Sequence, residues 1–596
     1  MNSELIDGAY KFVDNKIILR IRDRVCESAD ELLASPLFRE VLDRYVHQLA
    51  RKDSPVLAMF GKDPGLISAV DIHEMNQTVS LLARMPLDWA EKIADDRRFL
   101  NRPGLLFDFI EGLYDYWRKF ERFLICDSQD DVLDQRPYRT FNSTVETLMN
   151  LVRSTYRDVQ ENLSGKHPRI YRQVSAGAEV SAIVMPKSMP GLGKRYSLQL
   201  QDIPVIRQVC LYPPMLINPP MNKRTGSFEK VSVNPLEISD INEHEWLCYP
   251  ASVGKMLVLI YFHEKFFELG FTMSNLFELA DDEVLKRKPD AIFLYGTSEH
   301  GMDQLSALPT VFYDDGDILV GAIPRRDEFG YFGYLKKMVL TLHNIKIIQQ
   351  GNLPYHGAMI QLHLLGGRSA NIVIIGDTGA GKSETIEAFR GLAGNKLREL
   401  TIIADDMGSF EFGPGGRVCG FGTEIGAFVR LDDLQPGYAF SQLDRSIIMN
   451  PNQVNARVVL PVTTLDNVIK GVPVDMVLYA NNYQPVDSEH ALIEQFQSPA
   501  DALDTFRTGT AMSKGTTTST GLVHTYFVNV FGPIQYPEQH NLIANKFFEE
   551  FFRQNIFVAQ LRTQLGVPGM DREGPVYAAR ALLELLESGL DQLHTN

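Results

Sequence analysis

The residues best suited to chemistry form a glycine-rich segment, GDTGAGKSE, that begins at Gly376. Its glycines let backbone N–H groups converge on phosphate oxygens, and the side chain of Lys382 can neutralise the β- and γ-phosphates of a nucleotide. The hydroxyl of Ser383 can coordinate Mg²⁺. The segment therefore predicts a nucleotide phosphate site. Its expected contacts come from Gly376, Asp377, Thr378, Gly379, Ala380, Gly381, Lys382, Ser383 and Glu384.

A loop of this kind binds phosphate when a strand leads into it and a helix starts from it. The apolar run Ala370–Ile375 predicts the strand, and Thr385–Phe389 continues a helix whose N-terminus adds positive potential. These neighbours favour a phosphate-binding loop over an ordinary strand-to-helix turn.

Two carboxylates follow the next predicted strand. The strand Leu400–Ala404 ends directly in Asp405 and Asp406. Carboxylates at the end of a strand beside a phosphate loop can hold a metal ion that faces the phosphates. The alternative is a surface turn, which the nearby loop makes the weaker interpretation.

The glycine content and the spacing of apolar residues change along the chain, which predicts separate domains. Residues 1–165 contain little glycine and carry apolar residues at helical spacing, which predicts a helical N-terminal domain. Its aromatic residues could line a ligand or partner surface, but their spacing favours packing between helices. They include Tyr114, Tyr116, Trp117, Phe120 and Phe123.

Residues 166–325 predict an α/β domain, and residues 326–596 predict a domain that carries the loop and ends in helices. Short apolar runs broken by Pro and Gly indicate one large mixed sheet with helices around it. Ser252–Leu269 shows a helical pattern. Further strands are expected at Ala291–Tyr295, Asp317–Ile323, Arg457–Pro461, Met476–Ala480 and Val523–Phe531, and helices at Asn541–Phe552 and Pro575–Leu590.

Composition narrows the function classes. A net charge of −16 argues against a general nucleic-acid binder. The five cysteines are scattered, as is typical of reduced thiols in a cytoplasm. The N-terminus lacks the basic and apolar runs of a secretory signal, and no apolar run approaches the ~20 residues of a membrane span. We therefore expect a cytoplasmic globular protein without a nucleic-acid or membrane partner.

Several segments around the loop resemble motifs of the phosphoenolpyruvate carboxykinase family, in its ATP-using branch, and more distantly of HPr kinase. They occur in the family's order over roughly residues 200–565. The matching segments are Tyr331–Lys337 (family YxGxxKK), Tyr355–Gly357 (its metal-binding histidine segment), Ala404–Asp406 (GDD), Gly422–Arg430 (FEGGCYAK), Asn455–Pro461 (NTRVSYP), Thr508–Ala511 (SGxTA) and Phe527–Gly532 (FSxxFG).

The resemblance implies an α/β fold with a mixed-sheet, phosphate-loop core of the carboxykinase type, a substrate-type α/β domain before it and an added helical domain. It implies decarboxylation of oxaloacetate and transfer of the γ-phosphoryl of a nucleoside triphosphate to the enolate, or the reverse. It also implies Mn²⁺ on Lys337, His356 and Asp406, and Mg²⁺ with the nucleotide at Ser383. The other implied site residues are Tyr331, Lys336, Lys382, Asp405, Arg457 and Thr510.

The chemistry of these residue types agrees with that implication. A lysine binds a metal only as the free amine, so Lys337 would need a lowered pKa. With the imidazole of His356 and the carboxylate of Asp406 it offers two nitrogens and one oxygen. That donor set suits Mn²⁺ better than Mg²⁺. Arg457 would be a fixed cation beside the migrating phosphoryl group.

The chain departs from the family where the substrate carboxylate is held. The family's GRSP arginine has no match, and the closest segment places Arg224 before Gly226 and lacks the Ser-Pro. Thr378 and Tyr334 replace a family serine and glutamate, and the helical region at 1–165 has no counterpart. The phosphoryl acceptor therefore stays open.

Three functions are compatible with these residues and with the family resemblance. The first is a carboxykinase, the second a kinase of the same superfamily that acts on another small molecule or a protein, and the third a nucleotide-binding regulatory protein. The choice among ATP, GTP and pyrophosphate, the oligomeric state and the role of the helical domain also stay open.

Overall fold

The computed structural model describes residues 10–13, 16–21, 25–126, 137–167, 170–172, 180–185, 189–211, 213–224, 226–298, 302, 305–306, 310–393, 396–434, 440–513 and 521–588. The chain forms two compact units, Met1–Pro168 and Arg169–Asn596. Both mix helices and strands, so the expected α/β class is confirmed. None of the described helices combines the length and the apolar character needed to cross a membrane. Cys26, Cys248 and Cys419 are buried.

The first unit is mostly helical, as the spacing predicts, and its helices pack around one apolar core. It also holds a small sheet, which the sequence pattern does not predict, and Phe123 lies in one of its strands. Its helices are α1 (Ala29–Ala34), α2 (Pro36–Arg51), α3 (Ala69–Leu82), α4 (Leu87–Ile93), α5 (Pro103–Arg118) and α6 (Pro137–Ser164). Its strands are β1 (Tyr10–Val13), β2 (Lys16–Ile21) and β3 (Glu121–Cys126).

A buried carboxylate fixes the start of α3. The Oδ2 atom of Asp71 accepts hydrogen bonds from the backbone N–H and the hydroxyl of Ser68, which closes a capping box. Its Oδ1 atom accepts from Lys62 at 2.6 Å and from Arg98 at 2.7 Å. Burial alone would raise the pKa of Asp71, but these partners hold the pKa below its ordinary value.

Replacing Asp71 by asparagine should lower the free energy of unfolding by about 3 kcal/mol at neutral pH, because it breaks a buried charge cluster. The folded-state pKa is depressed, so this stabilisation is present above the ordinary pKa of about 4 and is lost below it. Calorimetry of the whole chain should show a gap between wild type and variant that closes on acidification. Asp63→Asn, an exposed change nearby, should leave stability unaltered, and a gap that persists in acid would contradict the account.

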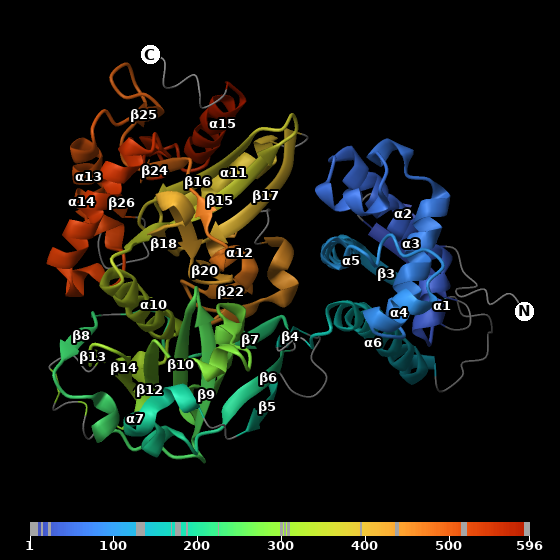
Figure 1. The fold of residues 1–596 in the computed structure, drawn as a ribbon, viewed down its shortest axis with the longest axis horizontal. Helices are drawn as coiled ribbons and strands as arrows, with labels where there is room; N and C mark the ends of the chain where they lie inside the picture. The colour runs from blue at the N-terminus through green and yellow to red at the C-terminus, as the bar shows by residue number, and fades with distance from the viewer. Residues whose placement is uncertain are drawn as a thin grey trace, which may run out of the picture. The chain divides into compact units, whose positions relative to one another are not determined.

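The second unit holds two large sheets, not the single one expected (Figure 1). The ten-stranded sheet has β4 (Ile170–Arg172), β5 (Val180–Met185), β6 (Val205–Leu211), β8 (Glu229–Val231), β9 (Trp246–Val253), β10 (Met256–His263), β11 (Glu278–Leu279), β12 (Ala291–Thr297), β13 (Val311–Asp314) and β14 (Leu319–Pro324). The nine-stranded sheet has β15 (Leu353–Leu364), β16 (Ser369–Ile375), β17 (Leu397–Ala404), β18 (Met407–Phe412), β19 (Val418–Gly422), β23 (Val472–Pro473), β24 (Met476–Asn481), β25 (Ile493–Gln495) and β28 (Phe557–Arg562).

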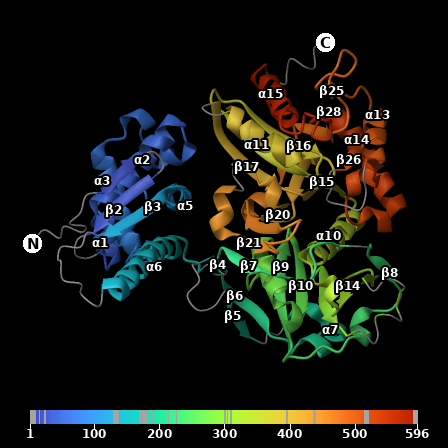
Figure 2. The same ribbon diagram turned by 180° about the vertical axis from the view of Figure 1, so that it is seen from behind.

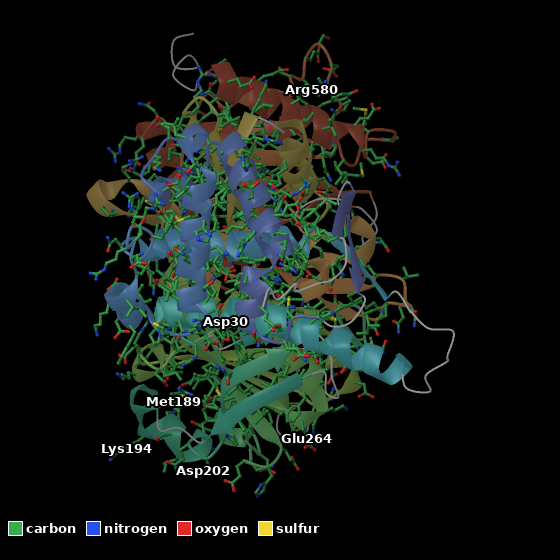
Figure 3. All side chains as sticks on the ribbon, turned by 90° about the vertical axis from the view of Figure 1, so that its right-hand side faces the viewer. Asp30, Met189, Lys194, Asp202, Glu264 and Arg580 are labelled. Carbon is green, nitrogen blue, oxygen red and sulfur yellow. The ribbon has the colours of Figure 1, made fainter. Side chains whose placement is uncertain are left out.

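Helix α10 (Phe332–Gln349) packs against both large sheets and is buried along almost its whole length. The other helices are α7 (Gly193–Leu200), α8 (Phe267–Thr272), α11 (Lys382–Ala393), α12 (Leu465–Ile469), α13 (Pro499–Thr508), α14 (Pro537–Arg553) and α15 (Glu573–Ser588). Figure 3 shows Lys194 of α7 and Arg580 of α15 at opposite ends of this unit.

A four-stranded sheet joins distant parts of the second unit. It consists of β7 (Met215–Ile217), β20 (Gly426–Arg430), β21 (Ile447–Met449) and β22 (Arg457–Pro461), and β7 pairs in parallel with β21 (Figure 2). A short hairpin pairs β26 (Thr510–Ser513) with β27 (Gly521–His524). The segment after β7 is thereby brought to the elements that carry Arg457.

Two expected elements are wrong. Ser252–Leu269 is not one helix: it spans the end of β9, a turn at Gly254 with φ +53°, the buried strand β10 and the start of α8. A continuous apolar run suits a strand buried on both faces as well as a helix. Val523–Phe531 is not one strand, because β27 ends at His524 and left-handed residues follow.

Candidate functional site

The predicted phosphate loop connects β16 to α11, in the strand–loop–helix order that the sequence indicates. Gly379 and Gly381 have φ of +77° and +89°, a region that glycine adopts without strain. A Cβ at Gly376 would lie 2.7 Å from that of Ala380. Lys382 is 6% exposed, and its amine donates to the carbonyls of Gly376 at 2.6 Å and Asp377 at 3.1 Å.

Side chains from neighbouring strands hold the loop in place. Asn482 donates to the Gly379 carbonyl at 2.8 Å and also bonds both backbone groups of Met512 in β26. Thr563 donates to the Ala380 carbonyl at 2.6 Å. The loop is thus tied to the hairpin that carries Thr510, one of the site residues that the resemblance implies. Sequence reasoning did not single out Asn482 or Thr563.

Backbone hydrogen bonds place His356 and Asp406 beside the loop. The N–H of Gly376 donates to the carbonyl of His356, and the N–H of Gly357 donates to that of Asp406. Strand β15, which carries His356, pairs with both β16 and β18. The Nε2 atom of His356 lies 3.1 Å from Oδ1 of Asp406. Two residues predicted as metal ligands therefore face each other.

The orientation of the His356 ring has an identifiable cause. Its Nδ1 lies 2.7 Å from the carbonyl oxygen of Val528. A carbonyl only accepts, so Nδ1 donates to it, and this bond turns Nε2 towards the carboxylate of Asp406. Phe527, Val528 and Asn529 all have φ between 46° and 64°, which is costly for a β-branched residue. This backbone directs the Val528 carbonyl at the histidine.

Lys336, His356, Asp406 and Glu424 form a cluster of polar side chains, and Lys336 contacts both of its carboxyl groups. Its amine donates to Oδ2 of Asp406 at 2.6 Å and lies 3.5 Å from Oε1 of Glu424. Burial opposes the charge, but the carboxylates of Asp406 and Glu424 raise the pKa of Lys336. Burial would also raise the pKa of Asp406, yet Lys336 and His356 hold it well below its usual range. Asp406 is therefore ionised at neutral pH.

Two other carboxyl groups have pKa values above the ordinary range, because burial outweighs the effect of their cationic neighbours. Burial and the charge of Asp406 raise the pKa of Asp405 to about 6. Burial, opposed by Lys336, raises the pKa of Glu424 to about 8. Glu424 is fully buried, and its Oε1 has no hydrogen-bond partner among the described residues. Sequence reasoning quoted its segment but gave Glu424 no role.

Lys337 has the property that a metal ligand needs. Burial, followed by the charge of Arg224, lowers the pKa of Lys337 to about 7, so a substantial share of the amine is free at neutral pH. The charges of Asp406 and Asp377 act on the same amine in the other direction. Among the described residues no group of three His, Cys, Asp or Glu side chains could hold a metal. A metal site with His356 and Asp406 would need a further ligand of another type, such as the amine of Lys337.

Arg224 lies in the segment that follows β7, and its charge acts on Tyr331 and Lys337. The segment that follows β7 is anchored by Asn450, whose amide donates to the carbonyls of Pro219 and Met221. Asn455 donates to the carbonyl of Asn222 at 2.6 Å. These bonds hold the segment against the turn before β22. The charge of Arg224 consequently acts on Tyr331 and on Lys337.

Two guanidinium groups are available for an anion. Tyr331 is 6% exposed and its hydroxyl is hydrogen-bonded to Arg457. The Nε atoms of Arg224 and Arg457 are buried and have no hydrogen-bond partner in the part of the chain that the structure describes. Within that part, neither arginine pairs with a carboxylate. Buried donors of this kind match the oxygens of a carboxylate or a phosphoryl group.

Ser383 and Thr510 lie at the edges of the cluster. Ser383 is exposed at the start of α11, and among described residues it makes no hydrogen bond to the lysine, histidine or aspartate predicted for Mn²⁺. Thr510 bonds His524 through its hydroxyl at 2.9 Å, and its carbonyl accepts from Tyr479.

No protein-family model matches this chain, and no curated protein matches it.

Proposed function

We propose that this chain is a nucleotide-dependent phosphotransferase of the carboxykinase type, which acts on a small carboxylate such as oxaloacetate. The observation that carries the proposal is the pair of buried Nε atoms of Arg224 and Arg457, which have no hydrogen-bond partner among the described residues. The sequence alone offered no cation for the substrate carboxylate. A partly buried guanidinium in this segment favours a carboxylate acceptor over an uncharged one.

The side chains divide the proposed reaction among them. Lys382 would neutralise the β- and γ-phosphates on the loop. Arg224 would hold the substrate carboxylate, and Arg457, bonded to Tyr331, would stabilise charge on the enolate and on the migrating phosphoryl group. The C–C bond to the departing CO₂ breaks, the electron pair passes to the enolate oxygen, and that oxygen takes the γ-phosphoryl group while the nucleoside diphosphate leaves.

Lys337, His356 and Asp406 would hold a divalent cation, and their two nitrogens and one oxygen suit Mn²⁺. When bound, Mn²⁺ would supply a Lewis acid for the enolate oxygen. The chain's own contribution is to keep the three donors available. The Val528 carbonyl orients the His356 ring, Lys336 keeps Asp406 ionised, and burial keeps a share of Lys337 neutral.

Mn²⁺ binding by the whole chain should weaken by more than about 10-fold when His356 is replaced by alanine, because loss of a ligand costs at least as much as the ~10- to 100-fold typical of losing a residue that only supports one. Electron paramagnetic resonance of free Mn²⁺ during a titration measures this directly. His363→Ala, on the same strand β15, is the matched control and should bind Mn²⁺ as the wild type does. Equal affinity in His356→Ala and wild type would remove His356 from the site.

Consumption of ATP by the purified chain tests the choice of acceptor. With Mn²⁺ and Mg²⁺ present, ATP should be consumed when oxaloacetate is added and not with malate or succinate, which yield no enolate on loss of CO₂. Consumption that needs no added carboxylate would favour a kinase with another acceptor. GTP and pyrophosphate in parallel reactions identify the donor.

A further inference from the structure

A polar cavity lies in the same unit, at the junction of the two large sheets. Its volume is about 170 Å³. Its walls come from the turn between β9 and β10, from α10 and from the strands β18 and β19. One ordered water needs ~10–15 Å³ in this measure, so the cavity accommodates a molecule of roughly ten non-hydrogen atoms.

The floor of the cavity presents a hydrogen-bond acceptor. His343 lines it and is 3% exposed. Its Nδ1 lies 2.9 Å from Oδ1 of Asn344, whose amide nitrogen donates to the Phe531 carbonyl at 2.8 Å. Nδ1 therefore donates, and burial lowers the pKa of His343, which keeps the ring neutral. Nε2 is left with a lone pair, and no donor reaches it among the described residues.

The cavity wall carries both signs of charge. Asp290 and Glu411 lie close enough for their charges to act on His343. Lys255 is paired with Glu411 at 2.8 Å, whereas Arg287 bonds only the Lys255 carbonyl, at 3.2 Å, within the described part of the chain. The carboxylates of Asp290 and Glu411 thus lie near His343. The guanidinium of Arg287 is exposed and has no carboxylate partner among the described residues.

We propose that this cavity binds a small zwitterion of the α-amino-acid class. Its ammonium group would donate to Nε2 of His343 beside Asp290 and Glu411, and its carboxylate would pair with Arg287. The C-terminal end of α10, whose last residues line the cavity, adds partial negative charge that favours an ammonium. An anion without an ammonium group would leave the His343 lone pair unmatched.

The cavity shares its elements with the candidate functional site. Helix α10 carries Lys336 and Lys337 at its other end, and β18 follows Asp406 directly. The N–H of Gly254, beside the cavity, donates to the carbonyl of Thr423, the residue before Glu424. A ligand in the cavity would therefore change the affinity of the neighbouring site, and this coupling, unlike the binding itself, rests on the proposed function.

The test is calorimetric titration of the whole chain with each standard amino acid at millimolar concentration, after a thermal-shift screen. We expect at least one to bind and succinate not to bind. Arg287→Ala should weaken that binding about tenfold or more, because a charged hydrogen bond is lost. Lys286→Ala, an exposed lysine on the same turn, is the matched control and should bind normally.

Absence of binding by every amino acid, or equal binding by wild type and Arg287→Ala, would overturn the proposal. Binding of succinate as tight as that of the amino acid would also overturn it, since the ammonium would then contribute nothing. These titrations do not use turnover. Their outcome is therefore independent of the outcome of the carboxykinase assay.

Discussion

The Lys382→Ala variant should lose nucleotide turnover by about a thousandfold. The amine is the one buried cation on the phosphate loop itself in the described structure, and it lies against the loop carbonyls of Gly376 and Asp377. Phosphoryl transfer spreads negative charge over the γ-phosphate oxygens, so removing this charge raises the barrier directly. Initial rates at saturating ATP measure the effect.

Lys396→Ala is the control for this variant. Lys396 is 60% exposed and pairs with Glu587 on the surface, so its loss should leave the rate within twofold of wild type. Both variants should unfold at the wild-type temperature. A Lys382→Ala enzyme with undiminished turnover would exclude the loop as the nucleotide site.

The Arg224→Ala variant should lower kcat/KM for the carboxylate substrate by about a hundredfold. Arg224 is partly buried and its Nε lacks a partner among the described residues, so an anion completes its hydrogen bonding. Nucleotide affinity should not change, because among the described residues Arg224 makes no hydrogen bond to the loop and its side chain donates to the carbonyl of Gly226. Arg224→Lys should recover only part of the loss, since an ammonium cannot reproduce the planar fork.

Lys223→Ala provides the matched control, because this neighbouring lysine is exposed. It should leave both kcat/KM and nucleotide affinity unaltered. An Arg224→Ala variant that turns over oxaloacetate as the wild type does would show that another cation holds the carboxylate. The observation on which the proposed function rests would then be lost.

Local sequence signals account for the strands and the helix around the candidate site whose positions were predicted correctly. The loop needs a strand before it and a helix after it, and β16 and α11 supply both within one short stretch. Strand β22 begins at Arg457 and ends at Pro461, as its apolar pattern indicates. Such signals depend on neighbours in the chain, so the sequence carries them directly.

Contacts between residues far apart in the chain left no comparable signal in the sequence. Arg224 comes to Lys337 through hydrogen bonds of Asn450 and Asn455, more distant in the chain than any periodicity reaches. The small sheet of the first unit pairs β2 with β3, whose sequences are a hundred residues apart. The apolar run in β10 fits either a buried strand or a helix, and only its pairing with β9 and β12 decides.

The measurement that tests the central claim most directly is phosphorus NMR of the whole chain with oxaloacetate, ATP, Mn²⁺ and Mg²⁺. We predict a phosphoenolpyruvate resonance that grows with ADP and is absent with Lys382→Ala. GTP and pyrophosphate serve as alternative donors in parallel samples. If no phosphoenolpyruvate forms with any of the three donors while the chain binds nucleotide, the carboxykinase assignment is contradicted.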